Sequence, residues 1–354
     1  MSRNLALVMT YKTLAFLTFS AFLWVSCNKS DPTPAPDFEV FLPSNFPAPV
    51  YDFSGNPVTQ AGFELGRKLF YDPVLSRDNT ISCGSCHIQY SAFTHHGHRV
   101  SHGIDGLLGK RNAPAIQNLA WGSAFFWDGG VPLLDLVPLN PIVNPVEMDE
   151  NPAKVLEKLR QHPEYPGLFK KAFGSEEINT SRFLQAMSQF MVSLVSANAR
   201  YDKYVRQEAG GTLNAEELAG LNTFRQKCAG CHKGDLFTDN SFRNNGLNND
   251  FSHDGGRYTA SLLDPDLGKF KVPSLRNVDK TAPYMHDGTY YTLEAVLEHY
   301  AGGVQESPTL DPLLRNTDGT RGIALSATEQ KNIIAFLKTL TDEEFLRDTR
   351  FSEQ

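Results

Sequence analysis

The sequence predicts a mainly α-helical protein made of two related halves, and three observations lead to this fold class. Apolar residues recur at helical spacing in several segments, whereas the strict alternation typical of strands is scarce. Capping residues stand where these periodic segments begin. A cysteine–histidine motif at 83–87 returns at 228–232, and a second motif repeats beside it. The double repeat indicates that one helical module occurs twice.

The first half is expected to hold three main helices. Thr59 can cap a helix whose apolar face comes from Phe63, Leu65, Leu69 and Phe70. Asn151 and Pro152 combine a capping residue with proline at the first helical position, and so they start another helix. Helical spacing of apolar residues then predicts one long amphipathic helix over 181–205.

The second half follows Gly210-Gly211, a pair that breaks the helical pattern. We take this pair as the boundary between two domains, 42–209 and 210–354. Three helices are expected in the second domain, and each begins at a capping residue: Asn214 (with Glu217), Thr292 and Ser326 (with Glu329).

The second repeated motif has a fixed spacing. The stretch A-P-A-I-Q-N-L at 113–119 is echoed by V-P-S-L-R-N-V at 272–278, and an Asp-Gly pair follows each copy. In both copies the proline stands fourteen residues before that Asp. The two halves are therefore predicted to be one module that was duplicated and then diverged.

The first repeated motif has the form C-x-x-C-H, which is the attachment signal for c-type haem. Two thiols at this spacing can each form a thioether to the porphyrin, and the His that follows becomes an axial ligand of the iron. The residues that would bind the two haems are Cys83, Cys86, His87, Cys228, Cys231 and His232. A zinc site is the alternative interpretation. It needs all four thiols to converge, and it leaves both histidines without a role.

The N-terminal segment is typical of a lipoprotein signal peptide. Positive charge accompanies an apolar stretch over 14–25 that is too short for a comfortable membrane span. Cys27 follows it and lies outside both haem motifs, so we expect a signal peptide over 1–26 and lipidation of Cys27. Residues 27–41 then form a tether, and the residue after Cys27 points to the outer membrane. The alternative is an ordinary secretory leader with an unrelated cysteine.

Charge and hydropathy exclude two classes of partner. The formal net charge of −7 argues against nucleic-acid binding. No later stretch is long and apolar enough to span a bilayer, so contact with the membrane is expected only through the lipid anchor.

Seven motifs together point to a family. They are L-G-R-K-L-F-Y-D-P (65–73), S-C-G-S-C-H (82–87), R-N-A-P-A-I-Q-N (111–118), F-W-D-G (126–129), N-P-V-E-M (144–148), C-A-G-C-H (228–232) and V-P-S-L-R-N (272–277). With them the chain resembles the bacterial di-haem cytochrome c peroxidases, including the MauG-type branch, from about Leu42 to Leu340. The resemblance implies two class I cytochrome c-like domains, each with one covalently bound haem. Peroxide would react at the N-terminal haem, and the C-terminal haem would pass electrons to it.

The resemblance also assigns two catalytic residues. Glu147 matches the acid–base group that moves a proton between the two oxygens of peroxide, and a largely apolar pocket would raise its pKa to suit both roles. The alternative for Glu147 is a surface position at a helix start. Trp127 matches a Trp that lies between the haems and carries an electron; a plain core Trp is the alternative.

One calcium ion is implied at the domain interface. Its protein ligands would be a side-chain oxygen of Asn112 and the carbonyl oxygens of Thr281 and Pro283, completed by waters. Without the resemblance, these would be read as ordinary turn residues.

The chain departs from the family at the first haem. In many members a His on a mobile loop blocks the first iron until the second is reduced. The matching position here is Ile104, which cannot bind iron. His102, in the same Gly- and His-rich stretch, is the nearest alternative ligand. A five-coordinate first haem that needs no reductive activation is the preferred expectation.

The second departure concerns the sixth ligand of the second haem. Many members place Met at the position of Tyr300, whereas the MauG type has Tyr there. Met285 is the competing ligand. The alternative for Tyr300 is an ordinary position in the hydrophobic core with no contact to the iron. A tyrosinate would lower the haem potential, whereas Met would raise it.

Three functions follow from these features. The first is a peroxidase, in the periplasm, that reduces hydrogen peroxide with electrons from a small cytochrome c, a cupredoxin or the quinol pool. The second is a MauG-like oxidation of a partner protein, which Ile104 and Tyr300 favour. The third is a non-catalytic di-haem electron carrier, against which Glu147 counts. Since the family includes dimers, a homodimer is a further expectation.

Overall fold

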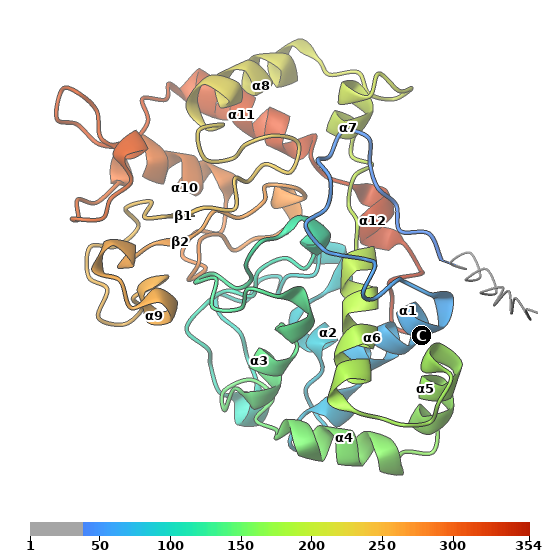
Figure 1. Cartoon of the computed structure of the whole chain (residues 1–354). Coiled ribbons are helices and arrows are strands. Elements are labelled where there is room, and N and C mark those ends of the chain that lie inside the picture. The colour runs from blue at the N-terminus through green and yellow to red at the C-terminus, as the bar shows by residue number, and fades with distance from the viewer. Residues whose placement is uncertain (1–37) are drawn as a thin grey trace, which may run out of the picture. The chain divides into compact units, whose positions relative to one another are not determined.

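The computed structural model describes residues 38–354, and helices dominate them, as predicted (Figure 1). The expected signal peptide, Cys27 and most of the expected tether lie outside the described residues. The helices are α1 (Gln60–Tyr71), α2 (Cys83–Cys86), α3 (Leu139–Val143), α4 (Pro152–Gln161), α5 (Tyr165–Phe173), α6 (Thr180–Ser193), α7 (Arg200–Val205), α8 (Ala215–Lys227), α9 (Tyr258–Ser261), α10 (Leu293–Glu298), α11 (Ala327–Lys338) and α12 (Glu343–Arg347). Strands β1 (Phe242–Arg243) and β2 (Phe270–Lys271) pair antiparallel. Within 38–354, no helix has the length and apolar character that a membrane crossing requires.

The helices begin at the predicted caps. Thr59 Oγ1 accepts the backbone N–H of Gly62 at 3.0 Å and so starts α1. Asn151 Oδ1 accepts an N–H of α4 at 2.8 Å. Reciprocal capping boxes start α8 and α11, and Thr292 caps α10. These side chains satisfy backbone donors that a helix start leaves without partners.

The prediction of one helix over 181–205 is wrong. Helix α6 ends at Ser193, and α7 begins at Arg200. The backbone N–H of Asn118 donates to Leu194 O at 2.8 Å, and its side-chain amide bonds both the N–H and the carbonyl of Ser196. These bonds hold the connecting segment out of the helix. They come from a distant part of the chain, so helical spacing of apolar residues cannot reveal them.

Each half is organised around a close helix crossing at a glycine. A Cβ atom built on Gly66 of α1 would lie 2.0 Å from the carbonyl oxygen of Ala186 in α6. One built on Gly220 of α8 would lie 1.9 Å from the carbonyl oxygen of Asn332 in α11. The two crossings anchor two separate hydrophobic clusters, and α12 adds its apolar residues to the first.

The repeated motif has the same conformation in both copies. Its residues adopt left-handed backbone at matching places, with φ between 55° and 72°: Asn118 and Asn277, Phe126 and Met285, Gly129 and Gly288. Matching backbone bridges, Phe125 with Val131 and Tyr284 with Tyr290, close the two turns. Non-glycine residues rarely adopt this conformation, so the agreement supports the duplication inferred from sequence.

A buried ion pair joins α7 to the second copy of the motif. The Arg276 guanidinium pairs with the Asp202 carboxylate, and both side chains are completely buried. Asp202 Oδ2 also accepts the N–H of Ala199 at 2.9 Å at the start of α7, and Arg276 Nη1 donates to Asp235 O at 2.8 Å. The two buried charges are therefore matched by each other and by further hydrogen bonds.

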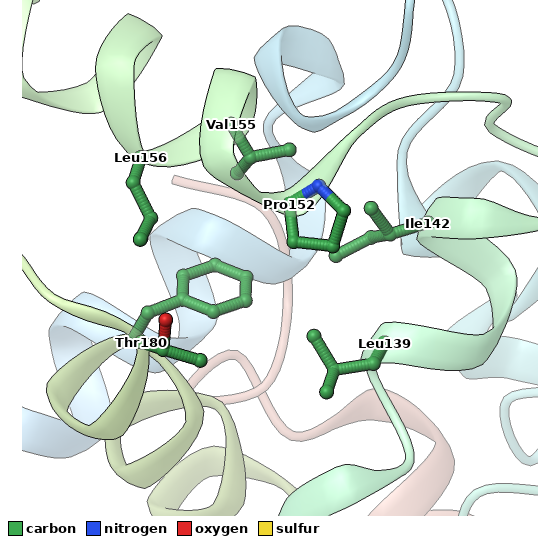
Figure 2. Close-up of a pocket in the computed structure, with 7 residues that line it drawn as sticks. Leu139, Ile142, Pro152, Val155, Leu156 and Thr180 are labelled. Atoms are coloured by element: carbon green, nitrogen blue, oxygen red, sulfur yellow. The ribbon is translucent and has the colours of Figure 1, made fainter.

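A small apolar cavity separates α3, α4 and α6. Figure 2 shows the side chains around it: Leu139, Ile142, Pro152, Val155, Leu156 and Thr180. Its volume of about 10 Å³ is room for about one water molecule. It is a packing defect of the first hydrophobic cluster and has no room for a substrate.

Candidate functional site

The first C-x-x-C-H motif forms the short helix α2 and the residue after it. Ser82 caps this turn, and its N–H donates to Ser85 Oγ at 3.1 Å. Gly84 packs on Tyr71 so closely that a Cβ there would meet the ring at 2.4 Å. The turn presents two free thiols, Cys83 and Cys86.

His87 is oriented by the backbone that follows it. Its Nδ1–H donates to Phe93 O at 2.6 Å, which leaves Nε2 as the free nitrogen. Burial lowers the pKa of His87 to about 4, so the ring is the neutral base that binds a metal.

The second motif repeats this geometry. His232 Nδ1 lies 3.0 Å from Phe237 O, burial lowers the pKa of His232, and Cys228 and Cys231 are free thiols. In each half, two thiols of one helical turn and an imidazole with a free Nε2 match what covalent haem attachment requires. The residues therefore fit two c-type haems.

Glu147 lies close to the first motif. Its half-buried carboxylate is within electrostatic range of Cys83 and Cys86, and Ser101 Oγ donates to Glu147 Oε1 at 3.4 Å. Burial raises the pKa of Glu147, while hydrogen bonds from Asn144 and Ser101 oppose the rise. A carboxyl with a raised pKa can both accept and return a proton near neutral pH.

Ile104 packs directly against the turn that carries Glu147. Its N–H donates to Glu147 O at 2.7 Å, and its side chain is completely buried. His102 is exposed and turns toward other histidines, with Nε2 3.4 Å from His98 Nδ1. The ring of His98 stacks in turn on that of His95.

Trp127 is held from both halves of the chain. Its indole Nε1–H donates to Asn112 O at 2.8 Å. Its own carbonyl accepts the N–H of Lys271 in β2 at 2.7 Å. Trp127 therefore belongs to a place where segments next to the two copies of the repeat meet.

Tyr300 and Met285 meet at one residue, Asn245. Asn245 Nδ2 donates to Met285 Sδ at 3.3 Å, and the Asn245 side chain also bonds the Tyr300 hydroxyl. Burial, with the nearby thiols Cys228 and Cys231, raises the pKa of Tyr300 to about 12. Both ligand candidates thus lie beside the second motif. Asn245 carries no motif signal and could not be identified from the sequence.

The three predicted calcium ligands belong to segments that lie together. The N–H of Asn112 donates to His286 O at 2.8 Å, and its side chain contacts the carbonyls of His98 and Arg99. A further backbone bond joins Gly97 to Ala282, which stands between Thr281 and Pro283. The segment of Asn112 and the segment 281–286 are therefore neighbours.

Comparison with known proteins identifies one family. A family model described as di-haem cytochrome c peroxidase matches residues 60–210. The methylamine utilization protein MauG of Methylorubrum extorquens is 36% identical over 309 residues, which cover 85% of this chain and 83% of that protein. The cytochrome c551 peroxidase of Nitrosomonas europaea is 34% identical over 285 residues, 79% and 80% of the two chains.

A solved structure agrees with these relatives. The crystal structure of a MauG-like protein associated with microbial copper homeostasis has 33% sequence identity to this chain and a TM-score of 0.81. The match covers 89% of this chain and 99% of that one. The similarity therefore extends well beyond the two attachment motifs.

Proposed function

Because the chain belongs to the di-haem cytochrome c peroxidase family, which includes MauG, we propose that it reduces hydrogen peroxide to water with electrons from a redox partner. It would do so with two covalently bound haems c. The balanced reaction consumes one peroxide, two electrons and two protons and releases two waters. The protein is accordingly an oxidoreductase, and its finer architecture is proposed to be two class I cytochrome c-like domains.

The observation that carries this proposal is the position of Glu147. It lies beside the first attachment motif, half-buried, with a raised pKa and with Ser101 and Asn144 bonding its carboxylate. When bound, the haem held by His87 supplies the iron that takes up peroxide. Glu147 would take a proton from one oxygen of the peroxide and give it to the other, which would then leave as water.

The experiment that tests this role compares two carboxylates of one turn. Glu147→Gln keeps the shape and removes the base, so peroxide cleavage is expected to slow by about a hundredfold or more in stopped-flow spectroscopy. Asp149→Asn is the matched control. Asp149 is paired with Arg77 at the surface, and its change should leave the rate unaltered. An unchanged rate in the Glu147 variant removes the acid–base role.

Electron delivery is proposed to run from the haem of His232 to the haem of His87 through Trp127. The support is that the Trp127 indole bonds Asn112 of the first half, while the Trp127 backbone carbonyl bonds Lys271 of the second half. Trp127→Phe should slow re-reduction of the first haem and leave its first reaction with peroxide intact. Equal electron transfer rates in the two proteins would contradict this role.

A MauG-like oxidation of a partner protein is the second candidate function. Ile104, in place of a blocking His, and Tyr300 near the second motif favour it. Steady-state peroxide turnover with reduced small cytochromes or cupredoxins separates the candidates. Turnover supports the peroxidase, whereas peroxide-dependent modification of a partner without turnover supports the alternative. A pure electron carrier would show neither.

A calcium ion held by Asn112, Thr281 and Pro283 is proposed to join the two domains, 42–209 and 210–354. The backbone bonds between these segments support it, because they make the segments neighbours. In addition, carbonyl and amide oxygens are ligands that suit this hard cation. Removal of calcium with a chelator should reduce turnover, and added calcium should restore it. A metal-free protein with full turnover would exclude the site.

The protein is proposed to lie in the periplasm and to be anchored to the outer membrane through a lipid on Cys27. The sequence around Cys27 supports this, and Cys27→Ser should release the protein from the membrane fraction. A homodimer is the proposed assembly, and sedimentation measures it. Persistent membrane association of the variant, or a monomer in solution, would contradict these two proposals respectively.

A further inference from the structure

Lys271 is a half-buried lysine whose amine lacks an anionic partner. It ends β2, opposite Phe242 of β1, and its N–H donates to Trp127 O at 2.7 Å. Its Nζ lies 5.9 Å from the centroid of the Phe125 ring. Burial lowers the pKa of this amine, and no carboxylate within residues 38–354 forms an ion pair with it.

Neighbouring cations differ from Lys271. Lys269, two residues earlier, has its amine 3.6 Å from a carboxylate oxygen of Asp266. Arg243 of β1 pairs with Asp239 and Asp311, each at 2.8 Å. A desolvated ammonium without a partner is costly, and here burial lowers the pKa of Lys271 to about 8. Unlike Lys269 and Arg243, Lys271 therefore has no carboxylate within ion-pair distance among the described residues.

Lys271 lies close to residues that contact both attachment motifs. Two residues further on, the carbonyl of Pro273 lies within hydrogen-bond range of His232, the ligand of the second motif. On its other side, Lys271 bonds Trp127 and faces Phe125, which belongs to the first hydrophobic cluster. Lys271 thus stands between the surroundings of the two attachment motifs. Haem carries two propionates, which are the anions that the cofactor would bring to this region.

We propose that Lys271 is the counter-ion of a haem propionate between the two attachment motifs, and that its charge raises the reduction potential of that haem. The proposal rests on the proposed function, because it requires bound haem. A nearby ammonium disfavours the ferric state, which carries one more positive charge than the ferrous state. Lys271 would in this way make that haem easier to reduce than it would be without the charge.

Potentiometric titration of the holoprotein, followed in the haem absorption bands, tests this role. Lys271→Met should shift the potential of one haem downward, and Lys271→Arg should keep it near the wild-type value. Lys269→Met is the matched control, since it removes the same charge from a position that has a carboxylate partner. Resonance Raman spectra provide a second readout, because the propionate bending band responds to hydrogen bonding.

The outcomes are separable. Unchanged potentials for both haems and an unchanged propionate band in Lys271→Met would overturn the proposal. If that variant does not fold, Lys271→Gln provides the same two measurements. The measured haem content distinguishes a failure of the proposed function from a failure of the proposed role of Lys271. A wild-type protein without two covalent haems would overturn the proposed function itself, whereas full haem content with unaltered spectra would overturn the role of Lys271 alone.

Discussion

At the scale of single residues, the chemistry depends on how burial tunes a few polar groups. Glu147 is the clearest case, because burial raises its pKa while Ser101 and Asn144 act against the rise. The same burial makes His87 a neutral ligand and raises the pKa of Tyr300 to about 12. The environment of each side chain therefore matters as much as its identity.

The raised pKa of Glu147 predicts a pH dependence. The carboxylate form accepts the first proton, so the rate of peroxide cleavage should fall as pH drops below the pKa of Glu147, by about tenfold per pH unit. The inflection should lie above the range of an ordinary glutamate. Stopped-flow rates across acid pH measure it. A rate that does not change with pH in this range, or a Glu147→Gln variant that keeps the inflection, would contradict the assignment.

Two substitutions can distinguish whether Tyr300 or Met285 is the sixth ligand of the second haem. With Tyr300 as ligand, Tyr300→Phe should change the near-infrared magnetic circular dichroism of the second haem, and Met285→Leu should leave the spectrum unaltered. Asn245 bonds both side chains, so neither variant alone removes its contacts. A methionine–iron band in the wild-type spectrum would assign the ligand to Met285 and exclude Tyr300.

At the scale of helices, the glycine crossings determine how each half packs. Gly220→Ala should destabilise the fold by several kcal/mol, because the new Cβ would overlap the Asn332 carbonyl in α11. Gly167 of α5 has no atom near the position of such a Cβ. Gly167→Ala should therefore stabilise the protein by about 0.4–1 kcal/mol. Chemical denaturation of both variants measures the difference, and equal effects would refute the packing argument.

The buried pair of Asp202 and Arg276 gives a second prediction about stability. Arg276→Met leaves the Asp202 carboxylate buried without its partner and should cost about 3–5 kcal/mol. Arg347→Met removes an exposed arginine that pairs with Glu343, and should cost about 0.5 kcal/mol or less. Denaturation midpoints measure both. A small loss in the Arg276 variant would mean that water reaches Asp202.

At the scale of the whole molecule, the question is whether one half must signal to the other before peroxide can react. Ile104 is fully buried at the position that the family resemblance assigns to a blocking His. The fully oxidised holoprotein should therefore react with peroxide at the same rate as protein that was first reduced by one electron. Rapid-mixing experiments on both forms test this. A reaction only after reduction would indicate a blocking ligand, with His102 as the nearest candidate.

Much of the fold could be predicted from local signals in the sequence. Thr59, Asn151 and Ser326 cap helices because their side chains bond the first N–H groups, and those bonds depend only on residues nearby in the chain. The two C-x-x-C-H motifs are equally local. Their histidines each find a carbonyl oxygen within a few residues, at Phe93 and at Phe237.

Features that depend on distant contacts could not be predicted. The break between α6 and α7 depends on Asn118, which lies far away in the sequence. Asn245 and Lys271 have no pattern around them, and their importance comes from what the fold places beside them. Resemblance to a family supplied the proposed roles of Glu147 and Trp127, which no spacing rule would have identified.

The matching turns at 125–131 and 284–290 have a consequence for how such a chain diversifies. The strained backbone is kept in both copies, although Phe126 occupies it in one and Met285 in the other. Left-handed conformation is unfavourable for either side chain by roughly 1 kcal/mol or more, so its retention reflects the scaffold and not the residue. The inferred duplication thus kept the same backbone turn in both halves, while the side chains on that turn could change independently in each half.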